Sequence, residues 1–286
     1  MIASIAKRVW EALVHPKIRL QADFPWGIGT MAKQYLVATF FYIVGSFLPL
    51  GLFFLALFIT GKINPALLTR LIGNDPNHVN MYIVICVVVA SFVSGFGLEL
   101  WYIRRCFHKD GLSLRKSMAI NLDSLGGSWW AAIWRALIAF GLVIVLEVAL
   151  SYLPLPEVRD PAAKFASGLS KFGFLTFALL ASVVAPVSEE LVFRGFLFNV
   201  CRTSFRQGFF QRLFHTHTSA DYAAIATSAA FFAAAHMNLA GFPALFLMGC
   251  ILASLYRRSG SLICPMLLHA FNNAAGMIVL FFSLYS

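Results

Sequence analysis

The chain has 286 residues, of which 60% are hydrophobic and only 12% are charged, whereas soluble domains carry about 25% charged residues. This composition excludes a soluble globular domain and predicts an all-α polytopic membrane protein. We attribute the net charge of +10 to membrane topology and expect no nucleic-acid partner, because basic residues gather in cytosolic loops.

The first 34 residues are expected to form a cytosolic or interfacial segment. Their apolar side chains recur at helical spacing at Ile2, Ile5, Val9, Trp10 and Leu13. Lys7 and Arg8 lie on the opposite side of that helix. The pattern predicts an amphipathic helix on an anionic membrane face, and an ordinary cytosolic helix is the alternative.

Apolar segments long enough to cross a bilayer, which takes about 20 residues, predict about seven transmembrane helices. They lie at residues 35–60, 81–103, 129–153, 169–206, 220–237, 242–256 and 262–285. The fourth is too long for one straight crossing, and Pro186 is expected to kink it. We therefore divide the chain into the N-terminal segment 1–34, N-terminal membrane helices at 35–168 and a catalytic membrane core at 169–286.

The distribution of basic residues predicts the orientation of these helices. With a cytosolic N-terminus and seven crossings, most of the 22 Lys and Arg residues fall in cytosolic segments, as is typical of membrane proteins. The C-terminus then lies on the opposite side. We expect an integral protein of a bacterial cytoplasmic membrane.

Three charged residues stand inside the fourth apolar segment, at Glu189, Glu190 and Arg194. A charge at membrane depth costs about 2.5–3.5 kcal/mol on insertion scales, so their presence needs a reason. Glu190 and Arg194 are four residues apart and can form an ion pair on one helix face. Glu189 is then left to face another partner.

Two histidines fall in apolar segments, His236 and His269. His236 follows Phe232 by four residues, and Asn273 follows His269 by four, so each pair shares a helix face. Packing histidines and a purely structural ion-pair network are the alternatives at this point. Glutamates 99 and 147 are interpreted as structural.

A glutamate and two histidines around one point suit the activation of water, with a histidine and an asparagine as donors to an oxyanion. The same groups could instead hold a divalent metal such as zinc, through Glu189, His236 and His269. We expect no cofactor, because a neutral amide beside these three makes a poor zinc set.

The order Glu-Glu-x-x-x-Arg, Phe-x-x-x-His and His-x-x-x-Asn resembles the CAAX-protease and bacteriocin-processing (CPBP, or Abi) family of intramembrane proteases. The motifs stand at residues 189–194, 232–236 and 269–273. The resemblance implies that Glu189 is the general base and that His236 helps to hold the attacking water. It assigns the oxyanion site to His269 and Asn273.

The resemblance also implies a structural role for Glu190 and Arg194, which we extend to Phe232. The expected function is an intramembrane endopeptidase acting on a membrane-associated, lipidated or leader-peptide substrate within the bilayer. The alternatives are a non-proteolytic membrane scaffold or bacteriocin-immunity protein that keeps the site, and a transporter with a proton relay. Substrate identity, metal dependence and oligomeric state stay open.

Overall fold

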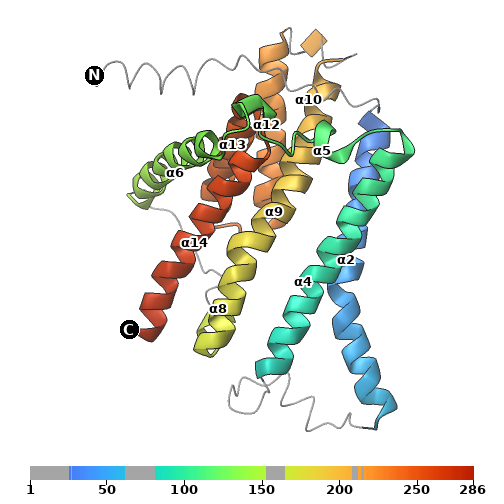
Figure 1. Ribbon diagram of the computed structural model, residues 1–286, viewed down its shortest axis with the longest axis vertical. Coiled ribbons are helices and arrows are strands. Elements are labelled where there is room, and N and C mark those ends of the chain that lie inside the picture. The colour runs from blue at the N-terminus through green and yellow to red at the C-terminus, as the bar shows by residue number, and fades with distance from the viewer. Residues whose placement is uncertain (1–25, 27, 62–80, 153–164, 208–211, 214–215) are drawn as a thin grey trace.

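The computed structural model describes residues 26, 28–61, 81–152, 165–207, 212–213 and 216–286. All the regular elements in these ranges are helices (Figure 1), as the all-α prediction requires. The amphipathic helix predicted near the N-terminus falls on residues 1–25, outside the described ranges.

The helices follow one another along the chain with short connections. The first half contains α2 (Ile28–Ile59), α4 (Met81–Lys109), the short α5 (Leu114–Ser117) and α6 (Trp129–Ser151). One continuous helical run then holds α8 (Lys171–Leu179), η2 (Leu180–Val184), α9 (Ala185–Glu190), η3 (Leu191–Phe198) and α10 (Asn199–Phe205). The chain ends with α12 (His217–Ala235), α13 (Phe242–Ser259) and α14 (Ile263–Tyr285).

Five helical segments in the described residues are long and apolar enough to cross a membrane. They are Ala32–Ile59, Cys86–Lys109, Trp129–Ser151, Lys171–Phe205 and Ile263–Tyr285. The helices α12 and α13, expected as the fifth and sixth spans, are not among them. The protein is thus an integral membrane protein, and the expected count of seven spans is not confirmed.

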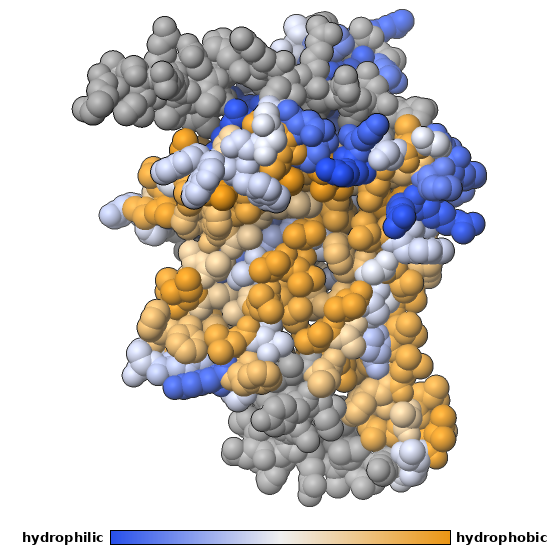
Figure 2. Space-filling view, viewed as in Figure 1, coloured by the Kyte–Doolittle hydropathy of each residue, from blue (hydrophilic) through white to orange (hydrophobic). Residues whose placement is uncertain are grey.

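The basic segments meet at one end of the molecule, which we call the basic end. The Trp26 indole donates to Asp110 just after α4. The Tyr256 hydroxyl at the end of α13 donates to the carbonyl of Met118 at 2.9 Å, which ties the α13–α14 turn to α5. On the face shown in Figure 2, hydrophilic residues gather toward this end, above a mainly hydrophobic middle.

The C-terminus lies at the other end of the molecule. The Tyr285 hydroxyl, on the last residue of α14, donates to the carbonyl of Leu169 at 2.6 Å. Lys171, the first residue of α8, lies 5.8 Å from the Tyr285 ring. The end of α14 therefore packs against the start of the α8–α10 run, away from the basic end (Figure 1).

Three arginines converge on one buried carboxylate at the basic end. Asp221 of α12 accepts from Arg206 at 2.6 Å and from Arg202 at 3.2 Å, both on or beside α10. Its other oxygen accepts from Arg257 of α13 at 2.8 Å. This Asp221 cluster joins the end of α10, the start of α12 and the end of α13.

From that cluster, α12 and α13 run as a hairpin beside the upper part of the α8–α10 run (Figure 1). The α12 helix has 19 residues and is about 28 Å long at 1.5 Å per residue. The stretch from Glu189 to Phe205 spans about 24 Å by the same rise. The turn of the hairpin therefore lies level with Glu189, half-way along the run, and not at its far end.

Candidate active site

Glu190 lies at the centre of the buried polar groups. Its side chain is 0% exposed, and its Oε1 accepts from the Arg194 guanidinium at 2.7 Å. The same oxygen lies 2.9 Å from Nδ1 of His269 on α14. The spacing of four residues predicts the first contact, and the second joins α9 to a helix far away in the sequence.

Arg194 is also fully buried and is held from three directions. Besides the ion pair, its Nη2 donates to the carbonyl of Gly249 on α13 at 3.3 Å. Its guanidinium lies 4.3 Å from the centroid of the Phe232 ring, within the range of a cation–π contact. Because the arginine touches α9, α12 and α13 at once, its loss would unpair a buried carboxylate and loosen three helices.

Glu189, the neighbouring carboxylate, faces both histidines instead. Its Oε2 lies 3.9 Å from Nε2 of His236 and 3.9 Å from Nε2 of His269. The side chain of Glu189 is 28% exposed and that of His236 is 33% exposed, whereas that of His269 is 5% exposed. The group is thus accessible from the side of Glu189 and His236, and closed on the side of His269.

The hydrogen bonds of the two imidazoles indicate which ring nitrogen carries the proton. Nδ1 of His236 lies 2.8 Å from the carbonyl oxygen of Phe232, which can only accept. Nδ1 of His269 faces the Glu190 carboxylate, which accepts when ionised. Both rings, when neutral, therefore present an unprotonated Nε2 toward Glu189. Three acceptors around one point are satisfied by a group that brings hydrogens, such as a water.

Phe232 separates this arrangement from the helix core. Its ring centroid lies 4.7 Å from that of His236 and 5.6 Å from that of His269, each edge-on. A third ring, Phe193, meets it at 5.4 Å. Phe232 is buried, so it fixes the positions of both imidazoles by packing while the Arg194 guanidinium covers its face.

Asn273 is engaged by the backbone of the α8–α10 run. The amide of Ala185 donates to the carbonyl of Leu180, five residues earlier, which is a π-helical bond. The next bond of that pattern would run from residue 186 to the carbonyl of Ala181, but Pro186 has no N–H. Asn273 supplies the missing donor, with its Nδ2 at 2.9 Å from the Ala181 oxygen. The kink predicted at Pro186 takes the form of this π segment.

A second π segment, η3, follows the carboxylates and carries Arg194. Asn199 donates through Nδ2 to the carbonyl of Gly195 and to the Tyr256 hydroxyl, both at 2.9 Å. Ser228 donates to the carbonyl of Phe193 at 2.8 Å. Our reading of the sequence did not single out these residues, although a polar Asn199 in an otherwise apolar run was a visible signal.

The donor atoms fit a metal poorly as they are placed. Ligands of a tetrahedral zinc at about 2.0–2.2 Å lie roughly 3.4 Å from one another, less than the 3.9 Å from Glu189 to each imidazole. Within the described ranges, no three His, Cys, Asp or Glu side chains form a group that could hold a metal ion. Of the remaining acidic residues, Glu99 is buried in α4 and Glu147 is exposed on α6.

Comparison with known proteins gives one match. Residues 171–275, which are less than half of the chain but include all seven of the residues singled out above, match a family model. No significant match was found among curated proteins or among solved structures. The matching family is described as Type II CAAX prenyl endopeptidase Rce1-like, and this segment is consistent with the CPBP/CAAX protease family that the three motifs resemble.

Proposed function

We propose that the protein is an intramembrane endopeptidase in which Glu189 activates a water molecule. The observation that supports this most directly is the position of Glu189 Oε2, at 3.9 Å from Nε2 of both His236 and His269. A water held among these atoms would donate one hydrogen to the carboxylate and the other to an imidazole. The family description, a prenyl endopeptidase, supports a hydrolytic reaction.

In the proposed reaction, Glu189 takes a proton from this water as its oxygen bonds to the carbon of the scissile peptide. His236 orients the water through Nε2. The resulting tetrahedral intermediate carries a negative oxygen. When it collapses, the C–N bond breaks and protonated Glu189 returns the proton to the leaving amine.

His269 would stabilise the negative oxygen only if Nε2 carries a hydrogen, which makes the ring an imidazolium. The Glu190 carboxylate at Nδ1 favours that charged form, because it lies 2.9 Å away. Asn273 keeps a second amide hydrogen besides the one given to Ala181, and we assign this hydrogen to the same oxyanion. Glu190 and Arg194 hold the site together, and no step is routed through a metal.

The proposed substrate is a peptide bond of a membrane-associated protein, such as a lipidated C-terminus or a leader peptide. The named family acts on prenylated CAAX proteins by its description, and a site half-way along a membrane-spanning run suits a substrate anchored in lipid. The protein would lie in a bacterial cytoplasmic membrane.

The test is cleavage by the purified full-length protein in lipid nanodiscs, read by mass spectrometry of prenylated and leader-type peptides. We expect the Glu189→Gln variant to fold normally and to lose about 10²–10⁴-fold in rate, the usual contribution of a general base. Glu147→Gln, an exposed glutamate on α6, is the matched control and should cleave normally. Cleavage by Glu189→Gln at the wild-type rate would contradict the proposal and favour the scaffold alternative.

A further inference from the structure

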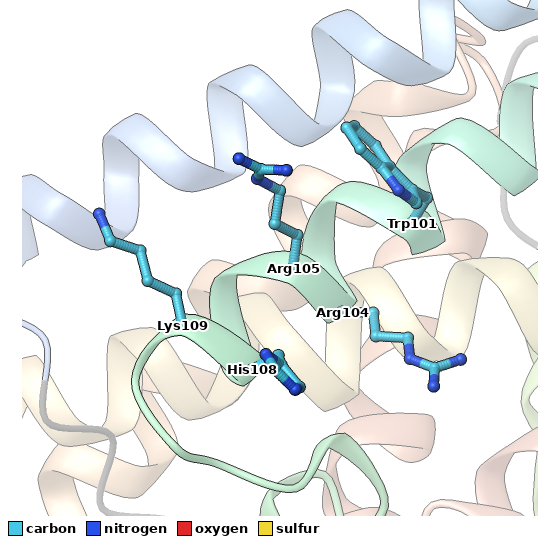
Figure 3. A pocket seen from close by; sticks show the side chains of 5 residues that line it. All are labelled: Trp101, Arg104, Arg105, His108 and Lys109. Carbon is cyan, nitrogen blue, oxygen red and sulfur yellow. The ribbon is translucent and has the colours of Figure 1, made fainter.

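A second candidate site lies at the basic end, far from the carboxylates. A pocket of ≈ 500 Å³ there is lined by Trp101, Arg104, Arg105, His108 and Lys109, all from the last two turns of α4. Figure 3 shows Arg105 and Lys109 pointing toward α2, while Arg104 and His108 point to the other side of α4. The catalytic proposal uses none of these residues.

A second pocket, of ≈ 420 Å³, adjoins the first between α2 and α4. It shares Arg105 and Lys109 with the first pocket, and Lys33 of α2 adds a third cation. Its one carboxylate, Asp110, accepts a hydrogen bond from the Trp26 indole. In the part of the chain that the structure describes, no carboxylate forms an ion pair with Arg105 or Lys109. The two pockets therefore carry an excess of positive charge from two helices.

The residues next to these cations are apolar and face lipid. Trp101, Arg105 and Lys109 are spaced by four and share one face of α4, and the Arg105 guanidinium lies 5.8 Å from the Trp101 ring. On α2, Leu36 and Phe40 follow Lys33 by three and seven residues, and both are exposed. Each helix thus presents basic groups at its end and apolar groups one to two turns deeper.

We propose that these adjoining pockets bind the headgroup of an anionic phospholipid of the membrane leaflet at the basic end. Its phosphodiester would contact Arg105 and Lys109, with Lys33 beside them, and its acyl chains would lie along Leu36 and Phe40. Basic pockets between membrane helices bind anionic headgroups in this manner. The apolar strip favours a lipid over a free phosphate, which would use only the charged part. A bound lipid would hold the ends of α2 and α4 together.

Native mass spectrometry of the full-length protein tests this inference, after extraction into a neutral detergent and titration with phosphatidylglycerol. We expect Arg105→Gln/Lys109→Gln to weaken phosphatidylglycerol binding about 25-fold, from about 5-fold for each basic side chain near an anionic headgroup. The control is Arg115→Gln/Lys116→Gln, which removes the same charge from exposed positions of α5 and should bind as the wild type does. Unchanged melting temperatures without lipid would show that both variants fold.

Three outcomes would overturn the inference. Equal losses in the two double variants would reduce the effect to net charge. Equal binding of phosphatidylcholine and phosphatidylglycerol by the wild type would remove the role of the anion. Displacement of the bound lipid by millimolar inorganic phosphate would identify a phosphate site without a lipid component.

Discussion

Adjacent residues of a helix point about 100° apart, and the two neighbouring glutamates use that angle to meet different surroundings. Glu190 points into the helix core, where Arg194 and His269 both contact its Oε1. Glu189 points toward the two Nε2 atoms and keeps partial access to the outside. One carboxylate is thus placed to hold the site and the other to react.

Glu190→Ala should lower stability before it affects chemistry. The change leaves the fully buried Arg194 without its carboxylate, and breaking a buried ion pair costs about 3–5 kcal/mol. Thermal unfolding in detergent measures the loss, and Glu147→Ala is the control, since its glutamate is exposed on α6. An unchanged melting temperature for Glu190→Ala would show that the pair contributes nothing to folding.

The contact between Asn273 and Ala181 predicts a coupling between Asn273 and Pro186. Asn273→Ala leaves the Ala181 carbonyl without a donor, which costs about 1–3 kcal/mol when the group is buried. In a Pro186→Ala background, residue 186 has its own N–H to donate, so the same Asn273→Ala change should cost less. A double-mutant cycle of unfolding free energies measures the difference, with Asn272→Ala as the control. Equal costs in both backgrounds would contradict the proposed cause of the π segment.

At the scale of helices, apolar length alone predicted α2, α4, α6 and α14 well, because lipid selects long apolar runs whatever their partners. Our prediction for the fourth segment matched the α8–α10 run within about two residues. The two π segments inside it were not predictable, because they depend on donors from Asn273 and Ser228 on other helices. The sequence also does not show that α12 and α13 turn back level with Glu189.

The Asp221 cluster escaped prediction for a related reason. Its arginines carry the charge pattern of cytosolic loops, and only the tertiary structure brings three of them to one carboxylate. Asp221→Asn should therefore destabilise the protein by about 3–5 kcal/mol, since it leaves three clustered guanidinium groups without their counter-charge. Asp123→Asn, at an exposed aspartate, is the control for unfolding measurements. A stable Asp221→Asn variant would mean that helix packing alone holds the basic end.

At the scale of the whole molecule, the described chain starts at the basic end and finishes at the opposite one. Five crossings and seven crossings are both odd numbers, so the side predicted for the C-terminus does not depend on how α12 and α13 are counted. Positive charge at the basic end predicts that this end is cytosolic.

Reporter fusions can check this orientation. A fusion after Gly111, which follows α4, should report the cytosol, and a fusion at Ser286 should report the other side of the membrane. The first fusion serves as the control for the second. A cytosolic signal from both positions would require an even number of crossings between them and would reject the arrangement.

The hydrogen bond between Glu190 and His269 joins residues 79 positions apart, and this separation has a consequence for biosynthesis. His269 and Asn273 both lie on α14, which follows all the other described helices in the order of translation. Until α14 has entered the bilayer, Glu189 has only His236 beside it, and Glu190 lacks its partner across the site. A growing chain is therefore inert toward its neighbours, and hydrolysis begins only when the last helix has been inserted.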